Sequence, residues 1–145
     1  MERKHTHIGS YGIITNKDNI ILIRKARGGY TGLLDLPGGG IEHLEKPEET
    51  LKREIMEEVG ITIDNYQLLD VLASNLTWLV RDDLYEDLHH IGIIYLIKSN
   101  ETKIKEEADG IDSNGAKWYS ISSLHEDELT PFAKYAINYL KNNHL

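Results

Sequence analysis

Apolar positions along this chain recur with two different periods, which indicates a mixture of helices and strands. Leu51, Ile55 and Val59 recur every four residues, a spacing that places their side chains on one stripe of a helix. Pro47 suits the first position of this helix, because the amide hydrogen that it lacks would have no partner there. Gly60 suits the left-handed conformation that ends a helix. We therefore predict a helix from Pro47 to Val59.

Short apolar runs bounded by turn residues predict the strands of a sheet. The clearest run is HIGIIYLIK at residues 90–98, which is typical of a buried strand. The other predicted strands are residues 8–15, 20–25, 33–36, 62–80 with interruptions at 64–65 and 74–75, and 116–120. Residues 81–87 and 99–115 are predicted to be loops. Thr130 and Pro131 suit the N-cap and first position of a C-terminal helix that ends near Asn142.

This order of elements predicts an α/β fold, an α/β/α sandwich with a mixed β-sheet between helices. The 145 residues suit a single domain over residues 1–145. The formal net charge of −8 argues against a nucleic-acid polymer or an anionic membrane as the partner. A phosphorylated small molecule stays compatible with this charge, because bound cations invert the local field.

The chain has no cysteine, which excludes disulfides and thiolate chemistry. Its first residues, MERKH, are polar and lack the apolar core of a signal peptide. No run approaches the roughly 20 apolar residues that a membrane-spanning helix needs. We therefore expect a cytoplasmic protein without a membrane partner.

The predicted central helix carries three carboxylates on a face beside its apolar stripe. Glu54, Glu57 and Glu58 stand at i, i+3 and i+4, so their side chains are neighbours. Such a face is often merely solvated. A divalent cation with oxygen ligands, such as Mg²⁺, would remove the repulsion among the three groups. Arg53 can hold one carboxylate in its planar fork.

The residues from Gly39 to Ile61 have the spacing of a known motif. The matching positions are Gly39, Glu45, Arg53, Glu54, Ile55, Glu57, Glu58, Gly60 and Ile61. This pattern resembles the Nudix box at every specified position, and the chain resembles a Nudix (MutT-like) hydrolase. The resemblance implies a mixed sheet between helices and hydrolysis of a diphosphate linkage in a nucleoside diphosphate joined to a group X. It also implies dependence on Mg²⁺, for which Mn²⁺ can substitute.

The resemblance also assigns roles to residues of the box. It implies that Glu57 and Glu58 are metal ligands and that Glu54 is a ligand or the base acting on water. Arg53 would orient Glu54, and Glu45 would brace the loop against the helix. The carbonyl of Gly39 would complete the metal shell.

The resemblance extends to the acidic loop before Trp118, where family members often place a further ligand. Asp112 is the residue that we expect to serve as ligand or base; the alternative is a solvated acidic loop. The chain departs from the commonest form of the box at Leu44, Lys46 and Thr50, where glycine, a Ser or Thr cap and alanine are frequent. These departures leave the expected ligands intact.

Substrate contacts are predicted on both sides of the box. Arg24 and Arg27 end a predicted strand, where they contact a substrate phosphate or are solvated. The backbone of Gly38, Gly39 and Gly40 allows close approach of an anion. Trp78 or Tyr85 is expected to stack on a base or else to belong to the core or its rim. Arg81 is likewise a candidate for substrate binding. His89 and His90 point to opposite faces of a strand, so we expect one packed and one exposed side chain rather than metal ligands.

No proline occurs between Pro47 and Pro131, which counts against the NADH-type and ADP-ribose-type signatures of the family. The first expectation is therefore a nucleoside triphosphate, cleaved to the monophosphate and pyrophosphate. The alternative is a non-hydrolytic Nudix-fold nucleotide-binding or sensor module, but such modules typically lose box glutamates and this chain keeps them. A prenyl diphosphate isomerase on the same fold would call for a cysteine.

Overall fold

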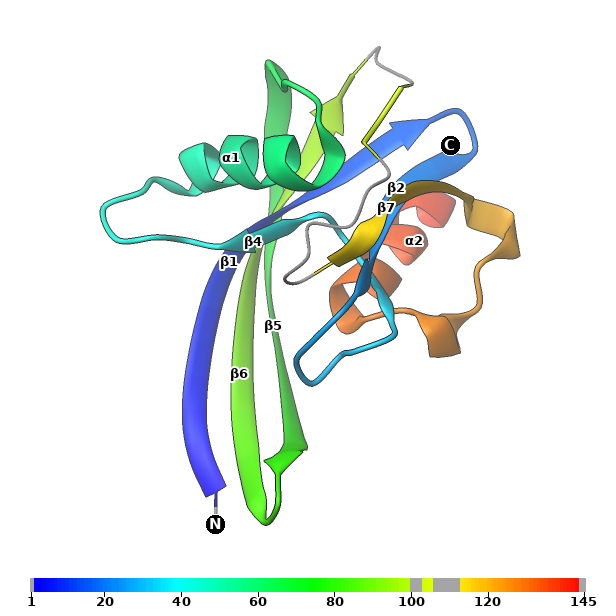
Figure 1. Ribbon diagram of the computed structural model, residues 1–145. Coiled ribbons are helices and arrows are strands. Elements are labelled where there is room, and N and C mark those ends of the chain that lie inside the picture. Colours follow the sequence, from blue (N-terminus) through cyan, green and yellow to red (C-terminus); the bar gives the residue numbers. More distant parts are fainter. Residues whose placement is uncertain (1, 100–102, 106–112, 144–145) are drawn as a thin grey trace.

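A curled mixed sheet lies between two helices in the computed structural model, which describes residues 2–99, 103–105 and 113–143 (Figure 1). The strands are β1 (Glu2–Asn16), β2 (Asn19–Lys25), β3 (Leu34–Asp35), β4 (Gly38–Gly40), β5 (Asn65–Arg81), β6 (Leu84–Lys98) and β7 (Ser113–Ser120). The helices are α1 (Pro47–Val59) and α2 (Pro131–Asn142), and 3₁₀ turns cover Ile121–Ser123 and Glu126–Glu128. The predicted α/β class and the limits of both helices are confirmed. No helix in these ranges is long and apolar enough to cross a membrane.

Strand β1 joins the two halves of the sheet, whose order is β3-β2-β1-β6-β5. It runs parallel to β6 and antiparallel to β4, with Gly9 opposite Gly40 and Tyr11 opposite Gly38. Its far end turns directly into β2, which pairs with β3 and β7. One strand therefore carries both the glycine turn at β4 and the long β5–β6 hairpin.

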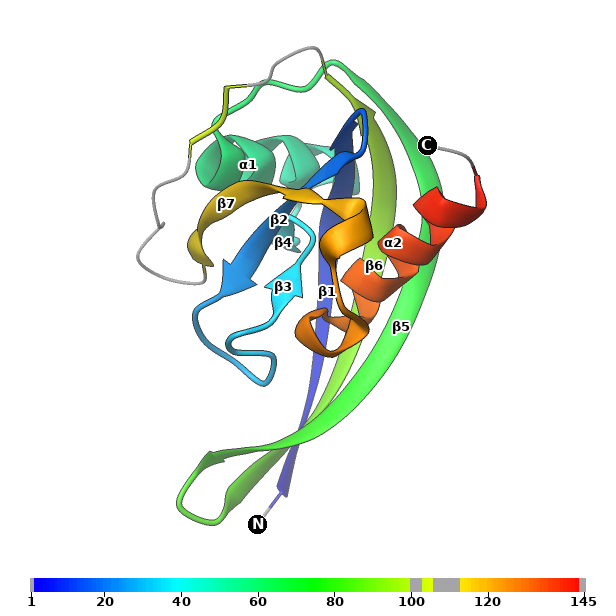
Figure 2. The ribbon, with the colours of Figure 1, turned by 90° about the vertical axis from the view of Figure 1, so that its right-hand side faces the viewer.

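The two helices cover opposite faces of the sheet (Figure 2). Leu51, Ile55 and Val59 of α1 are completely buried, as their spacing predicts, and Phe132 and Ala136 of α2 are buried on the other face. Successive strand side chains point to opposite faces, so strands covered on both faces are continuously apolar. The α1 side includes Ile14, Ile21, Ile23 and Ile97, and the α2 side Ile13, Ile20, Leu22 and Ile94.

Several predicted strand limits are wrong in the long hairpin. Strand β5 continues through Ser74 and Asn75, and the loop predicted at residues 81–87 is reduced to a turn at Asp82 and Asp83. The hairpin and the start of β1 extend beyond the helices (Figure 1), so polar side chains there face solvent without breaking the strand pairing. The polar residues of these segments therefore resemble a loop in the sequence, although they form regular strands.

The ends of other strands also differ from the prediction. Strand β1 begins at Glu2 instead of residue 8, because its polar first residues pair in parallel with the start of β6. The glycines of β4 were not expected to form a strand, yet they pair with β1. Strand β7 begins at Ser113, inside the predicted loop.

The pair of adjacent histidines divides as predicted. His90 is 8% exposed, whereas His89 is exposed. The Nε2 atom of His90 lies 2.7 Å from the Tyr11 hydroxyl, and its ring centroid lies 4.5 Å from that of Phe132. Burial lowers the pKa of His90 from 6.5 to about 3, and the positive charges of His7 and Lys25 act in the same direction.

This lowered pKa makes the stability of the fold depend on pH. Below pH 6.5 the unfolded chain takes up a proton that the buried ring does not, so stability falls as pH decreases from 6.5 towards 3. Between pH 8 and about pH 5.5, His90 alone should lower the free energy of unfolding by about 1.4 kcal/mol. Urea unfolding should show that loss in the wild type and in His89→Gln, and its absence in His90→Gln. Parallel pH profiles for the wild type and His90→Gln would contradict the assignment.

Candidate functional site

The guanidinium of Arg53, on α1, connects the helix to the segments that precede it. Its Nε and Nη2 donate to the two carboxylate oxygens of Glu45, at 2.8 and 3.0 Å. Its Nη1 donates to Glu54 at 2.8 Å, and Nη2 also reaches the carbonyl of Gly40 at 3.2 Å. The planar fork thus ties the loop, the helix and the glycine turn together. These carboxylates raise the pKa of Arg53 above its ordinary value, chiefly through the hydrogen bonds with Glu45.

Glu45 is held by further donors from the box. Thr50 Oγ1 donates to its Oε1 at 2.6 Å, and the amide of Glu42 donates to the same oxygen at 3.1 Å. The Arg53 bonds, followed by the Thr50 bond, lower the pKa of Glu45 to about 2. Thr50, one of the departures from the commonest box, therefore adds a donor that alanine lacks.

The other two departures have local consequences. Leu44 is 89% exposed and has φ of 66°, so it adopts the left-handed conformation that glycine favours. Lys46 provides no side-chain cap for α1. Its amide instead donates to the Glu49 carboxylate at 2.8 Å, which satisfies one backbone group at the helix start.

The glycine turn of β4 packs directly against glutamates of α1. The amide of Gly38 donates to Glu58 Oε1 at 2.7 Å, and Glu58 is 4% exposed. A Cβ on Gly39 would lie 2.5 Å from the carboxyl carbon of Glu54. A side chain at Gly39 would therefore displace the Glu54 carboxylate from the position in which Arg53 holds it.

The three glutamates expected to converge take two directions. Glu54 and Glu57 face Arg53, with oxygens 2.8 and 3.5 Å from Nη1, whereas Glu58 turns to Gly38. Within the described ranges, no three acidic or histidine side chains are arranged to hold a metal ion. Their chemistry nevertheless fits a hard cation, since carboxylate oxygens of α1 lie beside the open backbone of Gly39.

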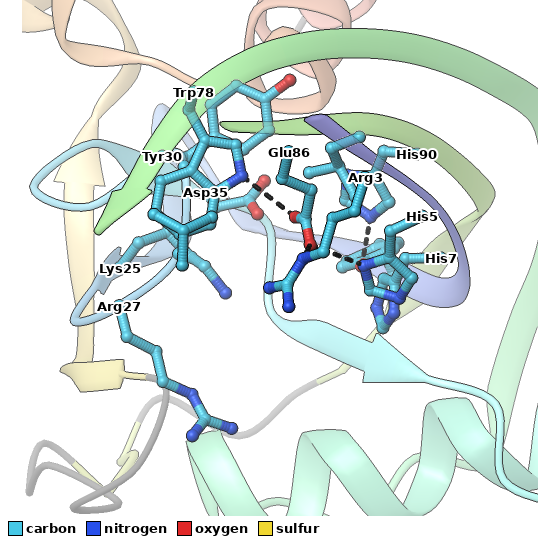
Figure 3. A pocket seen from close by; sticks show the side chains of 15 residues that line it. Arg3, His5, His7, Lys25, Arg27, Tyr30, Asp35, Trp78, Glu86 and His90 are labelled. Atoms are coloured by element: carbon cyan, nitrogen blue, oxygen red, sulfur yellow. Dashed lines mark hydrogen bonds and ion pairs between the residues drawn. The ribbon is translucent and has the colours of Figure 1, made fainter. Parts of the chain in front are cut away.

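A cavity of about 630 Å³ opens beside the glycine turn (Figure 3). Its walls come from β1, β5, β6, the ends of β2 and β3 and the loop between them, and they include the aromatic residues Tyr11, Tyr30 and Trp78. His7 lines this cavity and also a smaller one beside Gly40. A Cβ on Gly40 would lie 2.7 Å from His7 Cε1, so the cavity and the turn are direct neighbours.

A buried carboxylate holds the indole ring at the cavity wall. Glu86, which is 6% exposed, accepts hydrogen bonds from Trp78 Nε1 at 3.0 Å and from Arg3 Nε at 3.1 Å. His5 Nδ1 lies 3.4 Å from the same oxygen that Arg3 contacts. The Trp78 ring also packs against Gly29, where a Cβ would lie 2.9 Å from it.

The structure separates the predicted substrate-binding residues. Arg27 and Trp78 line the cavity. Arg24 instead donates to the carbonyl of Gly32 at 2.8 Å, and neither Arg81 nor Tyr85 belongs to the lining. Asp112 lies outside the described residues.

Sequence reasoning missed much of the cavity. The omitted lining residues include Arg3, His5, His7, Tyr11, Tyr30, Asp35 and Glu86. The alternation of His5, His7 and Tyr11 was a usable signal, because residues two apart on a strand share a face.

Known proteins resemble this chain over most of its length. Residues 5–140 match the NUDIX domain. An 8-oxo-dGTP diphosphatase of Escherichia coli strain K12 is 32% identical over 90% of this chain and 92% of its own length. An ADP-ribose pyrophosphatase of Methanocaldococcus jannaschii is 29% identical over 83% of this chain and 65% of its own length. The crystal structure of a MutT NUDIX hydrolase from Burkholderia pseudomallei gives a TM-score of 0.74 at 25% identity, covering 94% and 98% of the two chains. The chain therefore belongs to the NUDIX family, as its box predicted.

Proposed function

We propose that this enzyme, which acts on phosphorus-containing anhydrides as its pyrophosphatase relatives do, hydrolyses a nucleoside triphosphate to the monophosphate and pyrophosphate. The observation that carries the proposal is the position of the glycine turn. Gly39 contacts Glu54 of the box helix, and Gly40 contacts His7 at the cavity wall. A nucleotide with its base in the cavity would therefore place its phosphates beside the box.

The cavity suits a nucleoside in size and chemistry. Its volume of about 630 Å³ lies within the usual range of small-molecule sites. Trp78 and Tyr30 offer aromatic surface to a base, and Lys25 and Arg27 offer positive charge to phosphate oxygens. These residues support a phosphorylated nucleoside despite the acidic net charge of the chain.

The carboxylates of Glu54, Glu57 and Glu58 and the carbonyl of Gly39 would hold Mg²⁺, or Mn²⁺ in its place. When bound, such a cation neutralises diphosphate charge and makes water more acidic. Arg53 keeps the Glu54 carboxylate beside the glycine turn, where it serves as a ligand or accepts a proton from the attacking water. Glu45 fixes Arg53 in turn, so it acts by positioning.

The choice among nucleotides rests on the relatives and on the downstream sequence. The Escherichia coli relative, named for a deoxynucleoside triphosphate, covers more of this chain at higher identity than the ADP-ribose pyrophosphatase does. The absence of proline between Pro47 and Pro131 points in the same direction. ADP-ribose is the second candidate, because a relative is named for it.

Product analysis tests the proposed function. Incubation with Mg²⁺ and a panel of ribo- and deoxynucleoside triphosphates, ADP-ribose and NADH should release pyrophosphate and monophosphate from a triphosphate. Chelation should abolish turnover, and Mg²⁺ or Mn²⁺ should restore it. A clear preference for ADP-ribose or NADH would contradict the triphosphate assignment, and an absence of hydrolysis across the panel would contradict the enzyme assignment.

The proposed metal ligands lead to a prediction for the helix. Glu57→Gln and Glu58→Gln keep side-chain size but remove charge, so each should lower kcat about 100-fold or more at limiting Mg²⁺. Glu48→Gln, on the first turn of the same helix, should retain wild-type kcat. Circular dichroism would verify folding, and near-normal turnover in either ligand variant would contradict the assigned site.

The Arg53 contacts predict a different kind of loss. Lysine keeps the charge but cannot donate to Glu45, Glu54 and Gly40 at once. Arg53→Lys should therefore lower kcat about 100-fold through misplacement of Glu54. Steady-state kinetics with saturating Mg²⁺ measures this loss. Equal kcat in the two proteins would mean that the fork geometry is dispensable.

A further inference from the structure

Asp35 is a buried carboxyl group at the cavity wall that the proposed reaction does not use. It ends β3, is 3% exposed, and precedes the segment that leads to Gly38. Figure 3 shows its carboxyl group directed into the cavity, on the side of Trp78 and Tyr30. Such a group is costly to bury unless it finds hydrogen-bond partners.

The protein satisfies one of the two carboxyl oxygens of Asp35. Oδ1 accepts hydrogen bonds from Thr130 Oγ1 at 2.6 Å and from the amide of Leu36 at 2.8 Å. Thr130 is the N-cap of α2 and accepts from the amide of Ala133 at 3.3 Å, so its hydroxyl is itself oriented. Within the described residues, Oδ2 has no hydrogen-bond partner. Every fully buried side-chain nitrogen or oxygen atom there has one, so Oδ2 is not fully buried. Oδ2 therefore faces the cavity.

Other polar groups at the wall are already engaged with protein partners. Both oxygens of Glu86 accept hydrogen bonds, from Trp78 and from Arg3. His90 Nε2 lies within hydrogen-bond distance of the Tyr11 hydroxyl. Asp35 thus differs from Glu86 and His90 in presenting an oxygen to whatever enters between the aromatic side chains.

We propose that Asp35 determines which base the cavity accepts, its Oδ2 receiving a hydrogen bond from an N–H of the base, and that Thr130 positions the carboxylate. The proposal rests on the nucleoside site of the proposed function. Burial raises the pKa of Asp35, and the charge of Lys25 and the two hydrogen bonds to Oδ1 act in the opposite direction. A base N–H on Oδ2 would supply the partner that burial demands.

The substitution Asp35→Asn isolates this role because it preserves shape. The asparagine oxygen can still accept from Thr130 and Leu36, and its NH₂ then stands where Oδ2 was. The group facing the base changes from an acceptor to a donor. The variant should bind nucleotides whose base carries an N–H donor less tightly than the wild type does. It should therefore no longer prefer them to nucleotides whose base lacks that donor.

Calorimetric titration without metal measures the effect on binding alone. The ligands are monophosphates in matched pairs, one member of which lacks a donor group: the amino group in guanosine and inosine and in adenosine and purine riboside, and the N3–H in uridine and 3-methyluridine. In the wild type, loss of the N–H from the preferred base should weaken binding about 10- to 100-fold. In Asp35→Asn the two members of that pair should bind equally.

Two further substitutions distinguish base reading from a general disturbance. Asp70→Asn removes an exposed carboxylate that accepts from Tyr135 outside the cavity, and it should retain the wild-type discrimination. Thr130→Val should reduce discrimination with kcat little changed, and Thr130→Ser should restore it. Thermal unfolding of each variant controls for stability.

The outcomes separate this proposal from the proposed function. An unchanged N–H preference in Asp35→Asn, or no binding of any monophosphate to the wild type, would overturn the role of Asp35. Discriminating binding without hydrolysis of any triphosphate would instead overturn the proposed function and leave the role of Asp35 standing.

Discussion

The geometry of the site depends on the guanidinium of Arg53. It bonds Glu45 before the helix, Glu54 within it and the carbonyl of Gly40 in the neighbouring turn. A planar donor with a fixed fork suits this task because it can satisfy acceptors in several directions at once. Without it, the partly buried carboxylates of Glu45 and Glu54 would lose the positive charge that they share, and Gly40 would lose its hydrogen bond to α1.

Strand β1 relates this network to the cavity. Its middle residues pair with the glycine turn, whose contacts reach Glu54 and Glu58. Residues 2–14 of the same strand pair with β6, and alternate side chains from its first part line the cavity. A displacement of β1 would therefore move the acidic helix contacts and the cavity wall together. In the proposed function, recognition of the base and hydrolysis of the phosphates therefore depend on the same strand.

The sequence predicted those features that short segments determine. Pro47 and Gly60 limit α1, and Thr130 and Pro131 start α2, because capping depends on residues at the helix ends. The long hairpin was missed because its polar positions face solvent and resemble a loop. The cavity was largely missed because its wall combines segments distant in sequence, through a parallel pairing that no local pattern reveals. Asp35 is the one acidic residue in a short apolar run, a pattern that could have indicated a buried polar side chain at the cavity.

The most direct test is a crystal structure with Mg²⁺ and a non-hydrolysable nucleoside triphosphate. We predict the base against Trp78 with an N–H on Asp35, the phosphates beside the glycine turn, and the cation bound by glutamates of α1. A base outside the cavity, or a cation held by residues away from α1, would contradict this account.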